Sequence, residues 1–352
     1  MIAHVQIAGL FVAVERAARP ELTDRPVLIG GPVGRRGNVA VASSEAQALG
    51  VRTGMCMREA LALMPGAVCL PGSIERYLEA SAQLDERLRA TGCPVEWTAL
   101  DEAWLDLGPL DTARTRLDQA RAALARDFAL DAAIGVGATR AVAGVAARLM
   151  SPSGLLIVLP GYEARMLAPL GVARLPGLSD DDLARLRADG LETLGDLAHA
   201  DEARLVALVG RGGTVLSRHA LGLDDRDVAG SVPRGIARTV VLGACGASQA
   251  PGMIARLADD AAAGLRRSGH AARQVRLRVR DRAGERLRTH AFAAAIDDAA
   301  AIADAVDALA RRLLHPARDL YEAAVFLSAL TPVDAELPLF PVAGLARARR
   351  AS

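Results

Sequence analysis

The sequence predicts an α+β fold built from more than one domain. The chain has 352 residues, which at roughly 100–200 residues per domain favours two or three domains. Apolar runs typical of strands alternate with helical spacings up to about residue 160, and the pattern is helical only over 165–228. A strictly alternating run at 273–292 then predicts a hairpin in a second α+β domain.

The N-terminal part contains the strands and helices of the first predicted domain. Strands are expected at 2–14, 26–31, 37–43 and 131–137, with two more in 95–107 that turn at Asp101-Glu102. Helical spacing predicts helices at 44–50, 55–64, 73–91, 111–127 and 138–150. The alternation of the two element types indicates an α/β or α+β domain.

The remaining segments follow a different pattern. Short helices separated by Gly turns fill 165–228, and Ser179 followed by Asp182 predicts a capping box. A linker is expected at 229–238, followed by helices at 250–268 and 296–314, the hairpin, and a strand at 321–329. The tail spans 331–352.

Composition excludes several classes of function. All 42 basic residues are Arg, which excludes lysine Schiff-base chemistry and a Walker-type phosphate loop. The net charge of +1 gives no global attraction to nucleic acid or membrane. The four cysteines form no CxxC pair, so no zinc site or disulfide framework is expected and a reducing cytoplasm is favoured. No run reaches the roughly 18 apolar residues of a membrane span.

Adjacent carboxylates at Asp101 and Glu102 form the sharpest local signal. On a strand edge, such a pair can lie beside the divalent ions used in phosphoryl and nucleotidyl transfer. An exposed acidic turn is the alternative, because a DE pair alone is common. The pair does not decide between the two interpretations.

The surrounding sequence resembles a known family. ALDEAWLDLG (99–108) resembles the SIDEAYLD signature of Y-family translesion DNA polymerases, and IAHVQIAGLFVAVE (2–15) resembles their opening segment. GNVAVASSEAQALGVRTGM (37–55) and IGVGATRAVAGVAARLMSPSGL (134–155) resemble later segments in the same order. The resemblance implies a right-hand architecture. Its parts are a palm at 1–10 and 73–164, fingers at 11–72, a helix-hairpin-helix-like thumb at 165–228, the linker, and a little finger at 239–330.

The family's metal-binding residues are only partly present. Gln6 stands where active members carry an Asp that binds both metals, and Ala8 replaces the next carboxylate. Asp101 and Glu102 retain the remaining acidic pair, so any Mg²⁺ would be held by these two. Because a Gln amide is a poor Mg²⁺ ligand, the resemblance implies weak or absent metal binding.

The nucleotide contacts implied by the resemblance are also altered. Phe11 falls at the steric-gate position that excludes a ribose 2′-OH, and it is kept. Ser44 and Gln47 replace the Tyr and Arg of the fingers, and Ser151 replaces a Lys before the thumb. Since these groups normally hold the triphosphate, nucleotide binding is expected to be weakened.

Two regions are expected to bind DNA. Gly177 and Ser179 lie in a turn that resembles a helix-hairpin-helix, whose backbone N–H groups meet a phosphate; an ordinary helix connection is the alternative. Residues 234–290 hold twelve Arg and four acidic residues. Period-2 spacing places four of these Arg on one sheet face that would follow phosphates, unless cross-strand pairs neutralise them: Arg276, Arg278, Arg280 and Arg282.

The tail contains a short motif that resembles the QLxLF peptide with which bacterial polymerases bind the sliding clamp. Its residues are Glu336, Leu337, Leu339 and Phe340. Exposed Leu and Phe anchors suit a preformed apolar groove. The alternative is that Leu337 and Phe340 pack back onto their own domain.

These observations predict a non-catalytic or severely impaired Y-family protein that resembles the ImuB-type subgroup. It would bind primer–template DNA and the sliding clamp in damage tolerance or induced mutagenesis. Another polymerase or a recombinase-like mutasome protein is a further implied partner, and no membrane is expected. One alternative is an active translesion polymerase with an unrecognised third metal ligand and compensating charge from Arg52 or Arg140. Another is a DNA-binding module with a vestigial palm.

Overall fold

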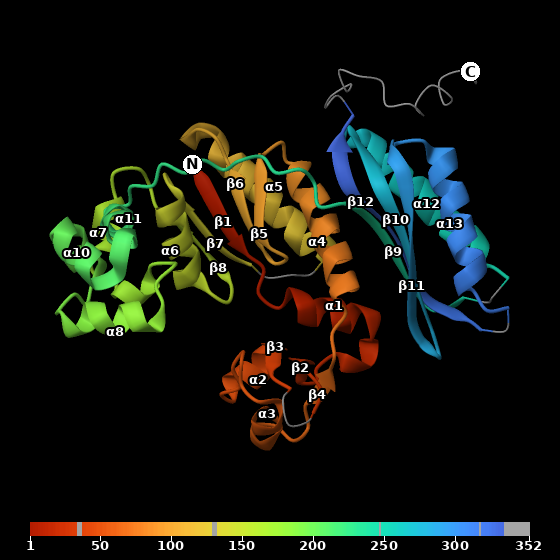
Figure 1. The fold of residues 1–352 in the computed structure, drawn as a ribbon, viewed down its shortest axis with the longest axis horizontal. Coiled ribbons are helices and arrows are strands. Elements are labelled where there is room, and N and C mark those ends of the chain that lie inside the picture. The colour runs from red at the N-terminus through yellow and green to blue at the C-terminus, as the bar shows by residue number, and fades with distance from the viewer. Residues whose placement is uncertain (34–36, 129–131, 246–247, 317, 334–352) are drawn as a thin grey trace. The chain divides into compact units, whose positions relative to one another are not determined.

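The computed structural model describes residues 1–33, 37–128, 132–245, 248–316 and 318–333. The chain separates into two compact units, Met1–Ser231 and Val232–Ser352. Figure 1 shows their helices and strands. In the described part of the chain, no helix is both long and apolar enough to cross a bilayer.

The first unit contains a five-stranded sheet, here called the palm sheet, with strand order β5-β6-β1-β7-β8. Its strands are β1 (Ile2–Gln6), β5 (Val95–Ala99), β6 (Glu102–Asp106), β7 (Ala133–Gly137) and β8 (Gly154–Ile157). Three helices accompany it: α4 (Ile74–Arg89), α5 (Leu110–Phe128) and α6 (Arg140–Met150).

The alternation of side chains along each strand decides what the two faces of the palm sheet carry. On β1, Ala3, Val5 and Ile7 share a buried cluster with residues of α4 and α5. His4 and Gln6 therefore lie on the opposite face, which α6 partly covers. A Cβ on Gly135 would stand 2.1 Å from the carbonyl oxygen of Ala143, so glycine is required where α6 crosses β7.

A second, three-stranded sheet has the order β3-β2-β4. It follows α1 in the chain and packs with two short helices around Leu28, Val39 and Met57. The elements are α1 (Leu10–Ala18), β2 (Val27–Gly30), β3 (Val39–Ala42), α2 (Ser44–Ala48), α3 (Met57–Leu63) and β4 (Val68–Leu70).

Short helices complete the first unit. They are α7 (Glu163–Leu167), α8 (Asp180–Ala188), α9 (Leu194–His199), α10 (Glu202–Val209) and α11 (Gly213–Ala220). Their apolar core is continuous with α6, because Val142, Val145 and Ala146 share one buried cluster with Leu175, Leu194 and others. This helical group is thus anchored to the palm sheet through α6.

The second unit is a four-stranded sheet of order β11-β10-β12-β9 with two helices on one face. Its elements are β9 (Ile236–Cys245), α12 (Ala250–Arg267), β10 (His270–Asp281), β11 (Gly284–Ile296), α13 (Ala299–Leu313) and β12 (Leu320–Pro332). The hairpin expected at 273–292 is confirmed as β10 and β11. Val275, Leu277 and Val279 are fully buried, as their alternation predicts.

Some sequence-based boundaries are wrong. The strand expected at 2–14 ends at Gln6, because Gly9 adopts φ +78° and α1 begins at Leu10. The turn expected at Asp101-Glu102 falls one residue earlier, since Glu102 already belongs to β6. β4, β8 and β9 were not predicted, and β9 begins inside the segment expected to be a linker.

Candidate functional site

The acidic pair lies at one corner of the palm sheet. Gln6 ends β1 and pairs in register with Glu102, which begins β6. The backbone N–H of Ile7 donates to the carbonyl oxygen of Asp101 at 2.8 Å and closes the corner. The sheet register therefore brings Gln6 beside the carboxylates that the sequence singled out.

The Glu102 carboxylate is already engaged by groups of its own chain. His4 Nε2 lies 3.0 Å from Glu102 Oε1, and Thr98 Oγ1 donates to the same oxygen at 2.9 Å. These contacts, the His4 hydrogen bond first, hold the pKa of Glu102 down at about 2 although partial burial opposes them, and the Gln6 amide adds a hydrogen bond. Glu102 is therefore ionised at neutral pH.

The residues present do not fit a two-metal centre. The family resemblance implies carboxylates at Gln6 and Ala8, but this chain has the Gln6 amide at the end of β1 and the exposed Ala8 beyond it. Among the residues that the structure describes, no group of three or more His, Cys, Asp or Glu side chains is arranged to hold a metal ion. Of the carboxylates that the resemblance implies, Asp101 and Glu102 are present.

Phe11 lies in the first turn of α1, not in a strand. Its ring packs against Tyr77 of α4, with centroids 4.8 Å apart. Tyr77 donates to the buried Glu15 carboxylate at 2.8 Å, and Arg76 pairs with the same carboxylate at 3.2 Å. Burial and the Glu15 charge raise the pKa of Tyr77 far above its ordinary value. The hydrogen bond from Tyr77 to Glu15 and the Arg76–Glu15 ion pair therefore hold in place the ring against which Phe11 packs.

The three positions implied for triphosphate binding are neutral and exposed. Ser44 and Gln47 lie on α2, and the Gln47 amide donates back to the carbonyl oxygen of Ala42 at 2.7 Å. Ser151 follows the last residue of α6 and is also exposed. None of the three supplies the positive charge that a triphosphate requires.

Arg140 does not supply that charge either. It is 8% exposed, and its two Nη atoms donate to both oxygens of Glu96, at 2.8 and 3.0 Å. Its guanidinium lies over the ring of Trp104, 4.5 Å from the centroid, and Trp104 stacks on His4 at 3.9 Å. The expectation that Arg140 compensates for lost charge is therefore wrong, whereas Arg52 is exposed.

This row of stacked and paired side chains was missed from the sequence. Glu96, Trp104 and His4 occupy one register row across β5, β6 and β1. Period-2 alternation places each of them on the face away from α4 and α5. The alternation can be read from the sequence of each strand separately, but the register between neighbouring strands cannot.

The turn before α8 has the geometry that its sequence predicts. Gly177 adopts φ +93°, and Ser179 caps α8 in a capping box with Asp182. Three carboxylates, Asp180, Asp181 and Asp182, occupy the first turn of α8. They offset the positive end of the helix and oppose a phosphate there.

The arginine stripe on β10 is less open than its spacing implies. Arg278 is 1% exposed and pairs with Glu322 of β12 at 2.6 Å and with Glu285 of β11 at 3.2 Å. Arg280 pairs with the same Glu322 at 3.1 Å. The expectation of an unpaired stripe is wrong, because acids from the two neighbouring strands lie between the cations.

The other stripe residues differ in exposure. Arg276 is half-buried, with its guanidinium 5.7 Å from the ring centroid of Phe326. Arg282 is exposed and donates to the Tyr321 hydroxyl at 2.8 Å. Arg282 and the exposed Arg273 are the β10-side cations best placed to meet a phosphate.

The clamp-motif residues lie outside the described part of the chain. They are Glu336, Leu337, Leu339 and Phe340. Their expected role stays a prediction from sequence.

Comparisons with known proteins cover most of the chain. Residues 5–148 match the impB/mucB/samB family, and residues 246–337 match the C-terminal domain of that family. DNA polymerase IV of Dehalococcoides mccartyi (strain CBDB1) is 32% identical over 286 residues, covering 79% of this chain and 73% of the relative. DNA polymerase IV of Methanoculleus marisnigri is 33% identical over 291 residues, covering 80% and 81%.

Solved structures resemble the chain over nearly its whole length. DinB from Sulfolobus solfataricus superposes with a TM-score of 0.60 at 20% identity, covering 93% of this chain and 98% of that chain. A post-insertion binary complex of Dbh DNA polymerase superposes with a TM-score of 0.62 at 19% identity, covering 94% and 99%. At this identity the likeness shows the fold alone.

Proposed function

Because this chain belongs to the impB/mucB/samB family of Y-family DNA polymerases and has their multidomain fold, we propose that it binds primer–template DNA but lacks, or is severely impaired in, nucleotidyl transfer. The observation that carries the proposal is the corner of the palm sheet. There the Gln6 amide stands opposite Glu102, at the position where the sequence resemblance implies a metal-binding carboxylate.

The altered positions act in the same direction. Removing one electrostatic group at a reacting centre typically costs roughly 10²–10³ in rate. Here one metal-binding carboxylate is replaced at Gln6, and two cationic triphosphate contacts are replaced at Gln47 and Ser151. Losses within one site are not additive, but each of these weakens metal or nucleotide binding.

DNA binding is proposed from the family and from local charge. The relatives are named DNA polymerase IV. The exposed Arg273 and Arg282 give the second unit cations for the phosphate backbone, whereas the carboxylates at the start of α8 disfavour a phosphate at the Gly177 turn of the first unit. A protein with these properties would act in damage tolerance as an adaptor, as the resemblance to ImuB-type proteins implies.

The tail motif extends the proposal to the sliding clamp. Leu337, Leu339 and Phe340 would enter an apolar groove of the clamp. We expect Phe340→Ala to lower clamp affinity at least ten-fold, as measured by surface plasmon resonance with immobilised clamp, because such anchors carry much of the binding energy. Val333→Ala, outside the motif, should leave the affinity unchanged. Equal loss in both variants would contradict the motif's role.

A nucleotide-binding experiment tests the catalytic part of the proposal. Fluorescence anisotropy with labelled primer–template measures DNA affinity with and without the correct dNTP and Mg²⁺. We expect DNA binding that the nucleotide does not strengthen, because the triphosphate contacts are absent. A ten-fold tightening by the correct dNTP alone would contradict the proposal and favour an active translesion polymerase, for which the ionised Glu102 and Asp101 are the remaining support. Absence of DNA binding would contradict the adaptor function.

A further inference from the structure

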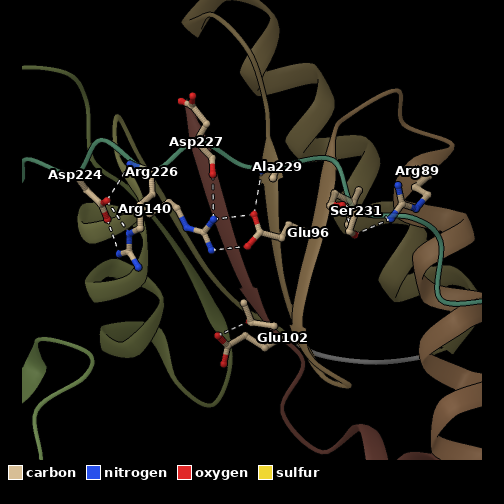
Figure 2. Close-up of polar contacts among 11 residues, drawn as sticks. Arg89, Glu96, Glu102, Arg140, Asp224, Arg226, Asp227, Ala229 and Ser231 are labelled. Atoms are coloured by element: carbon tan, nitrogen blue, oxygen red, sulfur yellow. Dashed lines mark hydrogen bonds and ion pairs between the residues drawn. The ribbon is translucent and has the colours of Figure 1, made fainter.

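The segment between α11 and β9 is hydrogen-bonded to residues of α6 and β5 over part of its length. Figure 2 shows it crossing the palm sheet beside β5. The carbonyl oxygen of Asp227 accepts a hydrogen bond from Arg140 Nη1 at 3.1 Å. The backbone N–H of Ala229 donates to Glu96 Oε2 at 3.0 Å. The Glu96–Arg140 pair thus holds this segment by one acceptor and one donor of its backbone.

A third contact lies two residues further along. The backbone N–H of Ser231 donates to the carbonyl oxygen of Val95 at 3.2 Å, and Ser231 Oγ donates to the same oxygen at 3.0 Å. Arg89 Nη2 of α4 donates to Ser231 Oγ at 3.1 Å. The free edge of β5 and the end of α4 therefore hold the last residue of the first unit.

The anchor is held in place by groups other than the segment. Stacking on Trp104 and the bidentate pair with Glu96 fix the Arg140 guanidinium. The hydrogen bond from Arg140 keeps the pKa of Glu96 below its ordinary value, so the pair is charged at neutral pH. Charge-assisted hydrogen bonds of this kind are roughly twice as strong as neutral ones.

We propose that Glu96 and Arg140 form a clasp that fixes residues 224–231 to the first unit and so sets the length of the tether to the second unit. With the clasp closed, the tether is Val232–Gly235, four residues before β9 begins at Ile236. With the clasp open and the Ser231 contacts released with it, the tether would extend back to Gly222, whose carbonyl oxygen accepts a hydrogen bond from Thr139 Oγ1, and would comprise Leu223–Gly235, thirteen residues.

The consequence for DNA binding rests on the proposed function, in which both units contact one DNA. Effective concentration falls roughly as the −3/2 power of tether length. Lengthening the tether from four to thirteen residues would therefore weaken the joint binding about six-fold. Glu96 and Arg140 act here as positioning residues, since neither contacts DNA in this proposal.

Hydrogen–deuterium exchange on the full chain tests the clasp directly. Glu96→Gln removes the charge of the pair, and Ala229→Pro removes only the N–H that the segment donates, leaving Glu96 and Arg140 untouched. We expect amides of peptides within 222–231 to exchange about ten-fold faster in both variants, with β6 protection unchanged. Unchanged protection of 222–231 in both variants would overturn the proposal.

Matched controls separate the clasp from general effects of substitution. Arg114→Gln removes an exposed ion pair with Asp118, and Gly230→Ala adds a Cβ that meets no atom within 4 Å. Both should exchange as the wild type does. If Gly230→Ala loosened the segment as much as Ala229→Pro, the donated hydrogen bond would not be the cause and the clasp would be refuted.

A measurement of DNA affinity distinguishes failure of the clasp proposal from failure of the proposed DNA-binding function. Anisotropy with primer–template should give about six-fold weaker binding for Ala229→Pro than for wild type. Equal affinities, with the segment released, would overturn the role of tether length. If wild type itself failed to bind DNA, the proposed function would fail, and the exchange experiment alone would still decide whether the clasp exists.

Discussion

At the scale of single residues, strand register decides which groups surround Glu102 at the corner of the palm sheet. Gln6 pairs with Glu102 in register. That Gln6 departs from the family pattern stays a prediction, because it rests on the sequence resemblance. The sequence did not predict that His4 and Thr98 engage Glu102, because those contacts depend on strand register and rotamers.

Restoring the carboxylates should restore metal binding. We expect the double variant Gln6→Asp/Ala8→Asp to bind Mn²⁺ at least ten-fold more tightly than wild type, since it returns oxygen ligands to β1 opposite Asp101 and Glu102. Titration followed by the electron paramagnetic resonance of free Mn²⁺ measures the affinity. Gln6→Asn is the matched control. Wild-type affinity equal to that of the double variant would show that the corner already holds metal.

The buried Arg278–Glu322 pair stabilises the second unit. Arg278 and Glu322 are 1% and 2% exposed. Removing one partner of a buried pair leaves an uncompensated charge and costs about 3–5 kcal/mol. We therefore expect Glu322→Ala to lower the free energy of unfolding by about 3 kcal/mol, measured by urea denaturation.

An exposed ion pair on the same unit provides the control. Arg311 pairs with Asp307 on α13, and both side chains are more than half exposed. Arg311→Gln should change the free energy of unfolding by less than about 0.5 kcal/mol. A cost for Glu322→Ala no larger than this would contradict the account of the arginine stripe.

At the scale of elements, helix caps and the alternation of apolar and polar residues along a strand gave correct predictions. Ser179 and Asp182 form the expected capping box, and β10 buries the expected face. Alternation along one strand, however, cannot show which residues of other strands lie beside it. Arg278 was therefore taken as open although Glu322, more than forty positions away in the chain, pairs with it.

The α8 cap gives a direct test of local stability. Ser179→Ala removes the hydroxyl that accepts from the Asp182 N–H, and such a loss costs about 1 kcal/mol. We expect a lower thermal midpoint by circular dichroism. Ser153→Ala, at an exposed position outside this cap, should leave the midpoint unchanged. A midpoint equal to wild type for Ser179→Ala would show that the cap contributes nothing.

The pH dependence of the clasp follows from Glu96. Its pKa is lowered in the folded protein, first by the Arg140 hydrogen bond. A lowered folded-state pKa gives stability that is complete above the ordinary value of 4.5 and is lost as the pH falls through the folded value. The thermal midpoint of Glu96→Gln should therefore lie below wild type at pH 7, and the difference should shrink as the pH falls below 4.5. A difference independent of pH would contradict the ion pair.

At the scale of the whole molecule, the chain joins two compact units through a partly fixed segment. The sequence predicted a linker at 229–238 from composition. The structure divides the units between Ser231 and Val232 and begins β9 at Ile236. Composition could not show that the part of this segment before Val232 is hydrogen-bonded to the first unit, because its partners Glu96 and Arg140 lie far away in the chain.

Whether the palm sheet still supports nucleotidyl transfer can be measured directly. Primer extension on undamaged template, with Mg²⁺ or Mn²⁺ and all four dNTPs, measures this activity beside the variant Asp101→Ala/Glu102→Ala. We expect no extension by wild type at a protein concentration that saturates the primer–template in a gel shift. Extension by wild type that disappears in the double variant would contradict the proposed loss of catalysis and assign a working metal site to the corner of the palm sheet.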